Sequence, residues 1–154
     1  FLTPSVGSDD TLGLTARIPF FWNIGPNSDL TITPHLFTEK LPILSGTYRH
    51  LFSFGQTEIE ASGGYVERTE NGATTDNALR GHIRWMGEAD IDENWRSNFQ
   101  FYRSGDDTYL RTFDIDDSGV LRSFATAEGF YRRLYVNATA FTVQEQRTNL
   151  VTLS

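Results

Sequence analysis

The sequence contains no cysteine and only one lysine, Lys40, among its 154 residues. Without cysteine, disulfide bonds and thiol chemistry are excluded. No run of about 18 apolar residues occurs, so the sequence predicts no membrane-spanning helix. Basic residues are outnumbered, 13 against 20 acidic ones, which gives a net charge of −7. Because clustered Lys and Arg bind phosphate backbones, this balance argues against a nucleic-acid partner.

The composition combines few hydrophobic residues, 38%, with many aromatic ones, 14%. A β-barrel with a polar lumen and an aromatic-rich lipid face has this combination, and so has a lectin-like β-sandwich. The chain begins at Phe1 without a methionine and ends within an apolar-polar alternation, so we expect a piece of a longer protein. Residues 1–154 are interpreted as a single partial domain.

The dominant period of the hydrophobic pattern is two, as where Leu79, Gly81, Ile83 and Trp85 alternate with polar residues. Such alternation gives a strand one apolar and one polar face, which is typical of antiparallel sheets. No window shows a convincing period of 3.6, so an all-β fold is expected. The expected strands are residues 2–6, 11–22, 29–38, 43–52, 56–67, 78–89, 95–103, 121–132 and 134–145, with a truncated tenth at 149–153.

Strand and connection lengths favour an up-and-down transmembrane β-barrel over a globular sheet. Several expected strands run for about 10 to 12 residues, close to the length of a tilted bilayer-crossing strand, whereas globular strands centre near 5–6. Longer polar loops are expected at Glu67–Asn77 and Arg103–Val120, and the turns between them are short. Outer-membrane barrels combine short periplasmic turns with longer outer loops, so this partial alternation fits them.

Three residues near the start of the chain suit particular places in such a barrel. Trp22 ends an expected strand before a Gly-Pro-Asn-Ser-Asp turn, where an amphipathic aromatic acts as an anchor at a membrane–water interface. Pro4 and Pro19 lie inside the first two expected strands. Proline has no N–H to give a ladder, so both weaken strand pairing there or simply mark strand ends.

Several short motifs resemble the barrel domain of the LptD family, the LPS-assembly outer-membrane proteins once called organic solvent tolerance proteins. They occur in order and at compatible spacing. The first motif is the first strand, at residues 2–7. The second, at residues 14–34, consists of a strand, an aromatic-Trp-Asn turn and another strand. The others are the segments 46–49, 104–114 and 136–139. Two positions depart from the family pattern: Thr47 stands where a charged residue is frequent, and Gly105 is inserted before a loop aspartate.

The resemblance implies a very large outer-membrane barrel, plugged by the lipoprotein LptE and preceded by a periplasmic β-jellyroll. LPS would pass up from the jellyroll, and the barrel would open between its first and last strands. The chain would then be the first third of that barrel in a Gram-negative bacterium, without the jellyroll domain. Pro4 and Pro19 would lie at one side of the lateral gate. The implied partners are lipopolysaccharide, LptE, the periplasmic LPS-transport bridge and membrane lipids.

Arginines of the expected inner face have two interpretations. Arg17, Arg80 and Arg84 are candidate contacts for LPS phosphates in the lumen, because Arg pairs well with phosphate. Alternatively, the latter two form cross-strand ion pairs with Glu58 and Glu60.

No enzyme or metal chemistry is expected. The acidic stretch from Asp114 to Gly119 fits the first positions of an EF-hand loop, but position 12 is Ala125 and no helices flank it, so a solvated turn is expected. No nucleophile elbow, phosphate loop or metal-ligand spacing is present, and no cofactor is expected.

Two other functions remain open on the sequence alone. A porin-like outer-membrane channel would need a constriction loop, which residues 103–120 could supply. A soluble carbohydrate-binding β-sandwich would show the same alternation, because exchanging inside and outside leaves the pattern unchanged.

Overall fold

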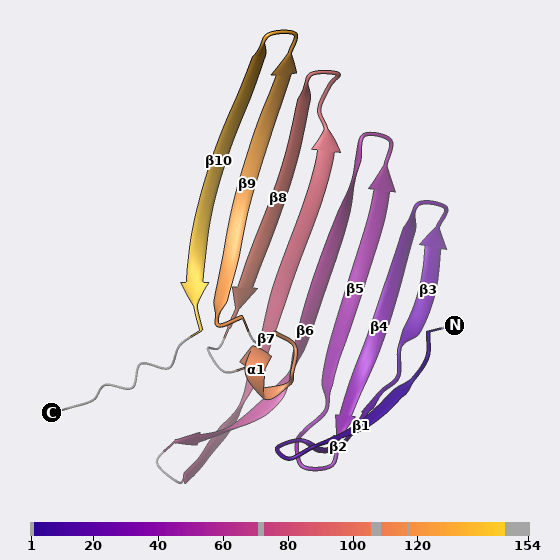
Figure 1. Ribbon diagram of the computed structural model, residues 1–154. Coiled ribbons are helices and arrows are strands. Elements are labelled where there is room, and N and C mark those ends of the chain that lie inside the picture. Colours follow the sequence, from indigo (N-terminus) through magenta and orange to yellow (C-terminus); the bar gives the residue numbers. More distant parts are fainter. Residues whose placement is uncertain (1, 71–72, 106–108, 117, 147–154) are drawn as a thin grey trace, which may run out of the picture.

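The computed structural model describes residues 2–70, 73–105, 109–116 and 118–146, which form one antiparallel sheet (Figure 1). Across the sheet, hydrogen-bonded neighbours follow the order β1-β2-β4-β5-β6-β7-β8-β9-β10. Strand β3 stands outside this order and pairs with β4. The strands are β1 (Ser5–Asp9), β2 (Gly13–Arg17), β3 (Phe20–Gly25), β4 (Ser28–Phe37), β5 (Ile43–Phe52), β6 (Gly55–Glu70), β7 (Ala73–Asp90), β8 (Trp95–Ser104), β9 (Val120–Tyr131) and β10 (Leu134–Glu145).

One short helix, α1 (Tyr109–Thr112), lies between β8 and β9. Among the described residues, no helix has both the length and the apolar character needed to cross a membrane.

The middle and end of the sheet match the expected strands closely. The observed β4, β5, β8, β9 and β10 begin and end within about two residues of the expected bounds, an accuracy typical of boundary assignment. They run for 10 to 12 residues. Consecutive strands pair antiparallel throughout this part, so the up-and-down arrangement is confirmed. The expected tenth strand at 149–153 lies outside the described residues.

The polar loop expected at Glu67–Asn77 is wrong. Strand β6 continues to Glu70 and β7 begins at Ala73, with Arg68 opposite Thr75. These residues are mostly polar, so no apolar period marks them as strands. Their backbone groups can nevertheless hydrogen-bond to one another once the apolar parts of β6 and β7 have formed the hairpin.

The first two expected strands are shifted and divided. Strand β1 begins at Ser5 instead of residue 2, and the strand expected at 11–22 is interrupted at Ile18 and Pro19, between β2 and β3. The ring of Pro19 fixes φ at about −65°, away from the φ of about −140° of an antiparallel strand, which explains the interruption. The expected nine strands are therefore observed as ten elements.

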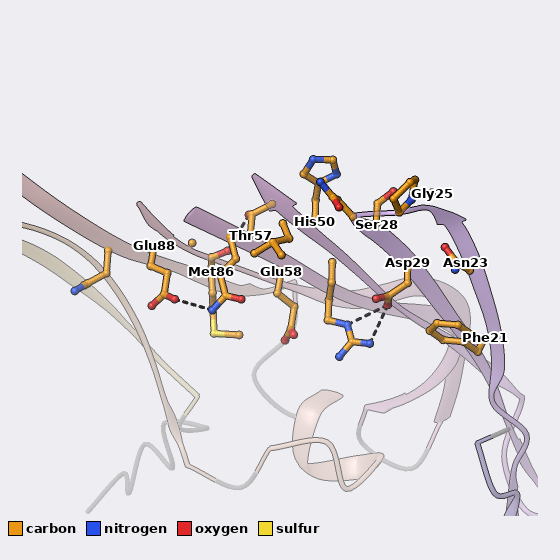
Figure 2. A pocket seen from close by; sticks show the side chains of 17 residues that line it. Phe21, Asn23, Gly25, Ser28, Asp29, His50, Thr57, Glu58, Met86 and Glu88 are labelled. Carbon is orange, nitrogen blue, oxygen red and sulfur yellow. Dashed lines mark hydrogen bonds and ion pairs between the residues drawn. The ribbon is translucent and has the colours of Figure 1, made fainter. Parts of the chain in front are cut away.

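The two expected faces of the sheet are confirmed by the strand register. Residues directly opposite each other in a ladder share a face. On one face Tyr65 lies opposite Leu79, and Trp85 lies opposite both Ile59 and Phe101. This face carries exposed apolar side chains, among them Leu79 at 72%. The other face is polar and concave, and α1 lies on its side (Figure 2).

The buried hydrophobic residues form one cluster, where the β8–β9 loop folds onto the concave face. We call this cluster the loop core. Its members are Leu12, Ile43, Tyr102, Tyr109, Leu110, Phe113 and Leu121, all at most 7% exposed. The expectation of an open polar loop at 103–120 is thus wrong in part, because Tyr109 and Leu110 of α1, and Phe113 directly after it, pack in this cluster.

Leu12 reaches the loop core because Gly13 turns the chain. Strict alternation would place Leu12 on the apolar face with Leu14, but Gly13 has φ +72° and reverses the side on which Leu12 lies. A Cβ at Gly13 would collide with Oγ1 of Thr38. Asp9 supports the turn, since its Oδ1 accepts hydrogen bonds from the N–H groups of Thr11 and Leu12.

We expect Gly13→Ala to lower the free energy of unfolding by about 1–2 kcal/mol or more, because a left-handed backbone is costly with a Cβ. Gly25→Ala is the matched control, since its Cβ would meet only Oγ of Ser28 at 3.4 Å. Urea unfolding of the full-length protein in detergent measures both. Equal stability of the two variants would show that the Gly13 turn is not required.

Candidate functional site

The end of the sheet that begins with β1 carries the two prolines. Strand β1 pairs with β2 over five residue pairs, from Asp9↔Gly13 to Ser5↔Arg17. Pro4 directly precedes this ladder on one strand, and Pro19 follows it two residues later on the other. The structure therefore brings Pro4 and Pro19 to the same end of the same short ladder. We call this place the seam.

Pro19 lies with its nitrogen toward the seam. The N–H of Ile18 donates to the carbonyl of Pro34 in β4, 3.3 Å away. Successive backbone N–H groups of an extended chain point to opposite edges, so the nitrogen of Pro19 faces away from β4. An ordinary residue would offer a donor to the next strand there, and proline offers none.

Beyond the seam, β3 has one free side among the described strands. It pairs with β4 only, from Phe20↔Ile32 to Gly25↔Ser28. The side chains of β3 are also exposed, with Trp22 at 65% and Phe20 at 60%. An unpaired strand edge within a bilayer leaves backbone N–H and C=O groups that another strand must pair with.

Trp22 lies on the apolar face near the turn end of the strands. A row of directly opposed residues crosses the sheet from it. This row is Trp22, Leu30, Tyr48, Ile59, Trp85 and Phe101. More aromatic rings occur toward the turns, where the rings of Phe52 and Phe54 stack at 5.3 Å and Nε1 of Trp95 donates to the Tyr131 hydroxyl at 2.9 Å.

The three candidate arginines do not converge on one point. Arg17 and Arg80 belong to one row across the concave face, separated by His35, Ile43 and Gly64. Four strand spacings correspond to about 19 Å. Arg17 lies 3.8 Å from a carboxylate oxygen of Asp114 in the β8–β9 loop.

Arg84 is held by groups of its own part of the sheet. Its Nη2 donates to Oε1 of Gln100 at 3.2 Å, and its guanidinium carbon lies 5.6 Å from the centre of the Tyr102 ring. The ion pair expected between Arg84 and Glu60 has the right register, since the two residues are directly opposite.

A buried polar network connects α1 to the sheet. Oγ of Ser62 lies 2.7 Å from Nδ1 of His82 and 2.9 Å from the Tyr109 hydroxyl. Burial raises the pKa of Tyr109, so its hydroxyl stays neutral and can hydrogen-bond. Nε2 of His82 lies 3.8 Å from Oε1 of Glu60. Serine, histidine and carboxylate thus meet, but Ser62 is only 9% exposed, which suits a loop attachment better than a nucleophile.

A hollow of about 610 Å³ occupies the turn end of the concave face (Figure 2). Asp29, Glu58 and Glu88 point to its concave side, and Arg49 donates to Asp29 at 3.0 Å. Sequence reasoning did not single out this place, although the alternation already put Glu58 and Arg49 on one face. The acidic excess suits water or a cationic group rather than a phosphate.

Comparison with known proteins identifies the family, although no family model matches the chain. LPS-assembly protein LptD of Pseudoalteromonas translucida is 34% identical over 113 residues, which cover 73% of this chain. The protein of the same name from Haemophilus influenzae is 32% identical over 114 residues, 73% of this chain. That of Mannheimia succiniciproducens is 32% identical over 126 residues, 81% of this chain. The chain belongs to the LptD family.

The matched region is a small part of each LptD relative, namely 15%, 14% and 16% of their lengths. Together with the open antiparallel sheet, this confirms the expected fold class: a segment of an up-and-down transmembrane β-barrel in an LptD protein. A β-sandwich would need two packed sheets, and the described residues form one.

The β8–β9 loop of this LptD segment should respond to acid. The Asp116 carboxylate accepts hydrogen bonds from Tyr102 at 2.7 Å and from the Ser118 N–H at 2.8 Å. Burial raises the pKa of Asp116, but these hydrogen bonds and Arg84 outweigh it and hold the pKa below its ordinary value. A depressed carboxyl pKa stabilises the folded loop above the ordinary pKa, and this contribution is lost as the pH falls through the folded value.

We therefore expect amide protection of α1 to decrease below about pH 4 relative to pH 6, after correction for intrinsic exchange rates. Asp116→Asn should remove most of this dependence. Asp114→Asn is the matched control, because the Asp114 side chain is 84% exposed. Hydrogen–deuterium exchange of the full-length protein measures the effect. A pH dependence that survives Asp116→Asn and disappears in Asp114→Asn would assign it to the wrong carboxyl.

Proposed function

We propose that this chain forms part of the barrel wall of an LptD protein that translocates lipopolysaccharide and inserts it into the outer leaflet of the outer membrane. The relatives are named LPS-assembly proteins, which supports this role. Within the full protein, the segment corresponds to the first third of the barrel. It serves as a conduit without catalysis, and the plug lipoprotein LptE and the periplasmic LPS-transport bridge are its proposed partners.

The observation that carries the gate proposal is the seam. A five-pair ladder ends between Pro4 and Pro19, and neither proline can donate a hydrogen bond beyond it. Each missing bond lowers the cost of separating the strands by about 0.5–1.5 kcal/mol. Weak pairing would be a flaw in a barrel that stays closed, whereas in a barrel that opens laterally it lowers the cost of opening.

Other residues of the segment have supporting roles in this proposal. Trp22 and the rings near the turns anchor the apolar face at the membrane–water interface, since amphipathic aromatics prefer that depth. Arg17, Arg80 and Arg84 contact LPS phosphates one at a time along the concave face. Their separation excludes a single site that clasps both phosphates at once.

Restoring the missing donors should close the gate. In growing cells that carry the full-length protein, a photoreactive residue at Phe20 should form LPS adducts. The double variant Pro4→Ala with Pro19→Ala should reduce these adducts several-fold, because two regained hydrogen bonds are worth about 1–3 kcal/mol. Pro42→Ala, which removes a proline between β4 and β5, is the control and should leave the adducts unchanged.

The two parts of the proposal fail in different ways. If no position on β1 to β3 gives LPS adducts in a stably assembled protein, LPS passage along this segment is wrong. If adducts form at Phe20 but are insensitive to both prolines, LPS passes here and the prolines do not control the gate.

A further inference from the structure

The hairpin of β1 and β2 is weakly attached through its strands. All five residues of β1 are exposed. Strand β2 reaches β4 through three residue pairs, Thr15↔Phe37, Ala16↔Leu36 and Arg17↔His35. By comparison, β9 and β10 share twelve residue pairs. A short ladder with exposed side chains opens at low cost in free energy.

Beyond the ladder and a few hydrogen bonds to the end of β4, such as that from the Thr38 N–H to the Leu14 carbonyl at 3.1 Å, one side chain of this hairpin is buried in the rest of the molecule. Leu12 is 3% exposed, and it is the only buried residue between positions 2 and 19, all of which the structure describes. It is buried inside the loop core, whose other members come from β5, β8, β9, α1 and, in Phe113, the residue that follows α1. The hairpin therefore depends on residues that lie about one hundred positions later in the chain.

The contacts around Leu12 lead directly to α1. The N–H of Glu39 donates to the Leu12 carbonyl at 3.2 Å, and this holds the turn against the end of β4. Phe37, the last residue of β4, packs against the loop core, and its ring lies 5.5 Å from that of Phe113. Phe113 is 1% exposed and its ring lies 5.2 Å from that of Tyr109.

A charged contact runs beside the apolar one. Arg17, the last residue of β2, lies 3.8 Å from Asp114 in the same loop. Both side chains are well exposed, at 40% and 84%, so solvent screens this pair. The apolar contact around Leu12 and Phe113 is therefore the one that holds the hairpin, and the ion pair adds orientation.

We propose that the β8–β9 loop is a brace that holds the β1–β2 hairpin against the sheet through the burial of Leu12 beside Phe113. Docking of the loop, more than the short ladder, then sets how freely the seam moves. The brace itself does not depend on the proposed LPS function. Its consequence does: if the seam is the gate, undocking the loop loosens it from inside the barrel.

The test is hydrogen–deuterium exchange on the full-length protein in detergent. Phe113→Ala should raise exchange in residues 6–9 and 15–17 by about tenfold or more, although these residues lie far away in sequence. Leu12→Ala should do the same. Residues 127–138, at the turn end of the β9–β10 hairpin, should keep their exchange rates, since none of them belongs to the loop core.

Each variant has a control of the same residue type. Leu14→Ala removes a leucine that is 62% exposed two positions from Leu12, and Phe141→Ala removes a phenylalanine that is 73% exposed. Both should change exchange of the hairpin less than twofold. In addition, the double variant Leu12→Ala with Phe113→Ala should raise the amide exchange of the hairpin little more than either single variant does, because the two residues act through one contact.

Three results would overturn the brace. Exchange could increase in α1 alone while the hairpin stays protected, which would make the loop core a local structure. Exchange could increase equally in residues 127–138, which would make it a general stabiliser. If Phe113→Ala does not assemble, Phe113→Leu takes its place, and normal exchange of the hairpin in that variant would equally refute the coupling.

A loosened hairpin with unchanged LPS adducts at Phe20 would leave the brace intact and refute its link to the gate.

Discussion

The apolar face of the sheet has no layer of protein against it. Leu79, Trp85 and Phe101 are among the many large apolar side chains that remain exposed there, and the described residues offer no second sheet to cover them. Within a bilayer, lipid covers such a face, and every backbone polar group must be satisfied by a neighbouring strand. This constraint explains the long strands, and it makes any place where strand pairing fails a special one.

Strand pairing between β1 and β2 ends at the seam, and the loop core on the concave face holds the same hairpin. Pro4 and Pro19 end a ladder of five residue pairs, while the only buried hydrophobic cluster of the described residues joins the same hairpin to α1. The segment therefore has a firmly paired wall from β4 to β10 and one edge whose position depends on an internal loop. This arrangement would suit the proposed function, in which the wall stays sealed and opens at one edge.

Much of the wall could be predicted from the sequence, because alternation over ten residues or more leaves little freedom in strand length or face. The faces of β6 and β7 follow directly from residues such as Ile59 and Trp85. The reversal of Leu12 could not be predicted, because it depends on the positive φ of Gly13. The loop core was missed because α1 has only four residues, too few for a helical period, and its partners are scattered over five elements. The hairpin tip around Arg68 and Thr75 was missed because polar residues carry no apolar alternation.

In this barrel segment the apolar face meets lipid and the concave face meets water. Spin labels attached to single cysteines in β7 test it most directly, and this segment has no cysteine of its own. In the full-length protein in bilayers, labels after Leu79→Cys and Ile83→Cys should be reached by oxygen, which dissolves in lipid. Labels after Arg80→Cys and Arg84→Cys should instead be reached by a water-soluble nickel complex. If all four positions are equally accessible to the nickel complex, the sheet does not separate lipid from water and is not a wall of a transmembrane barrel.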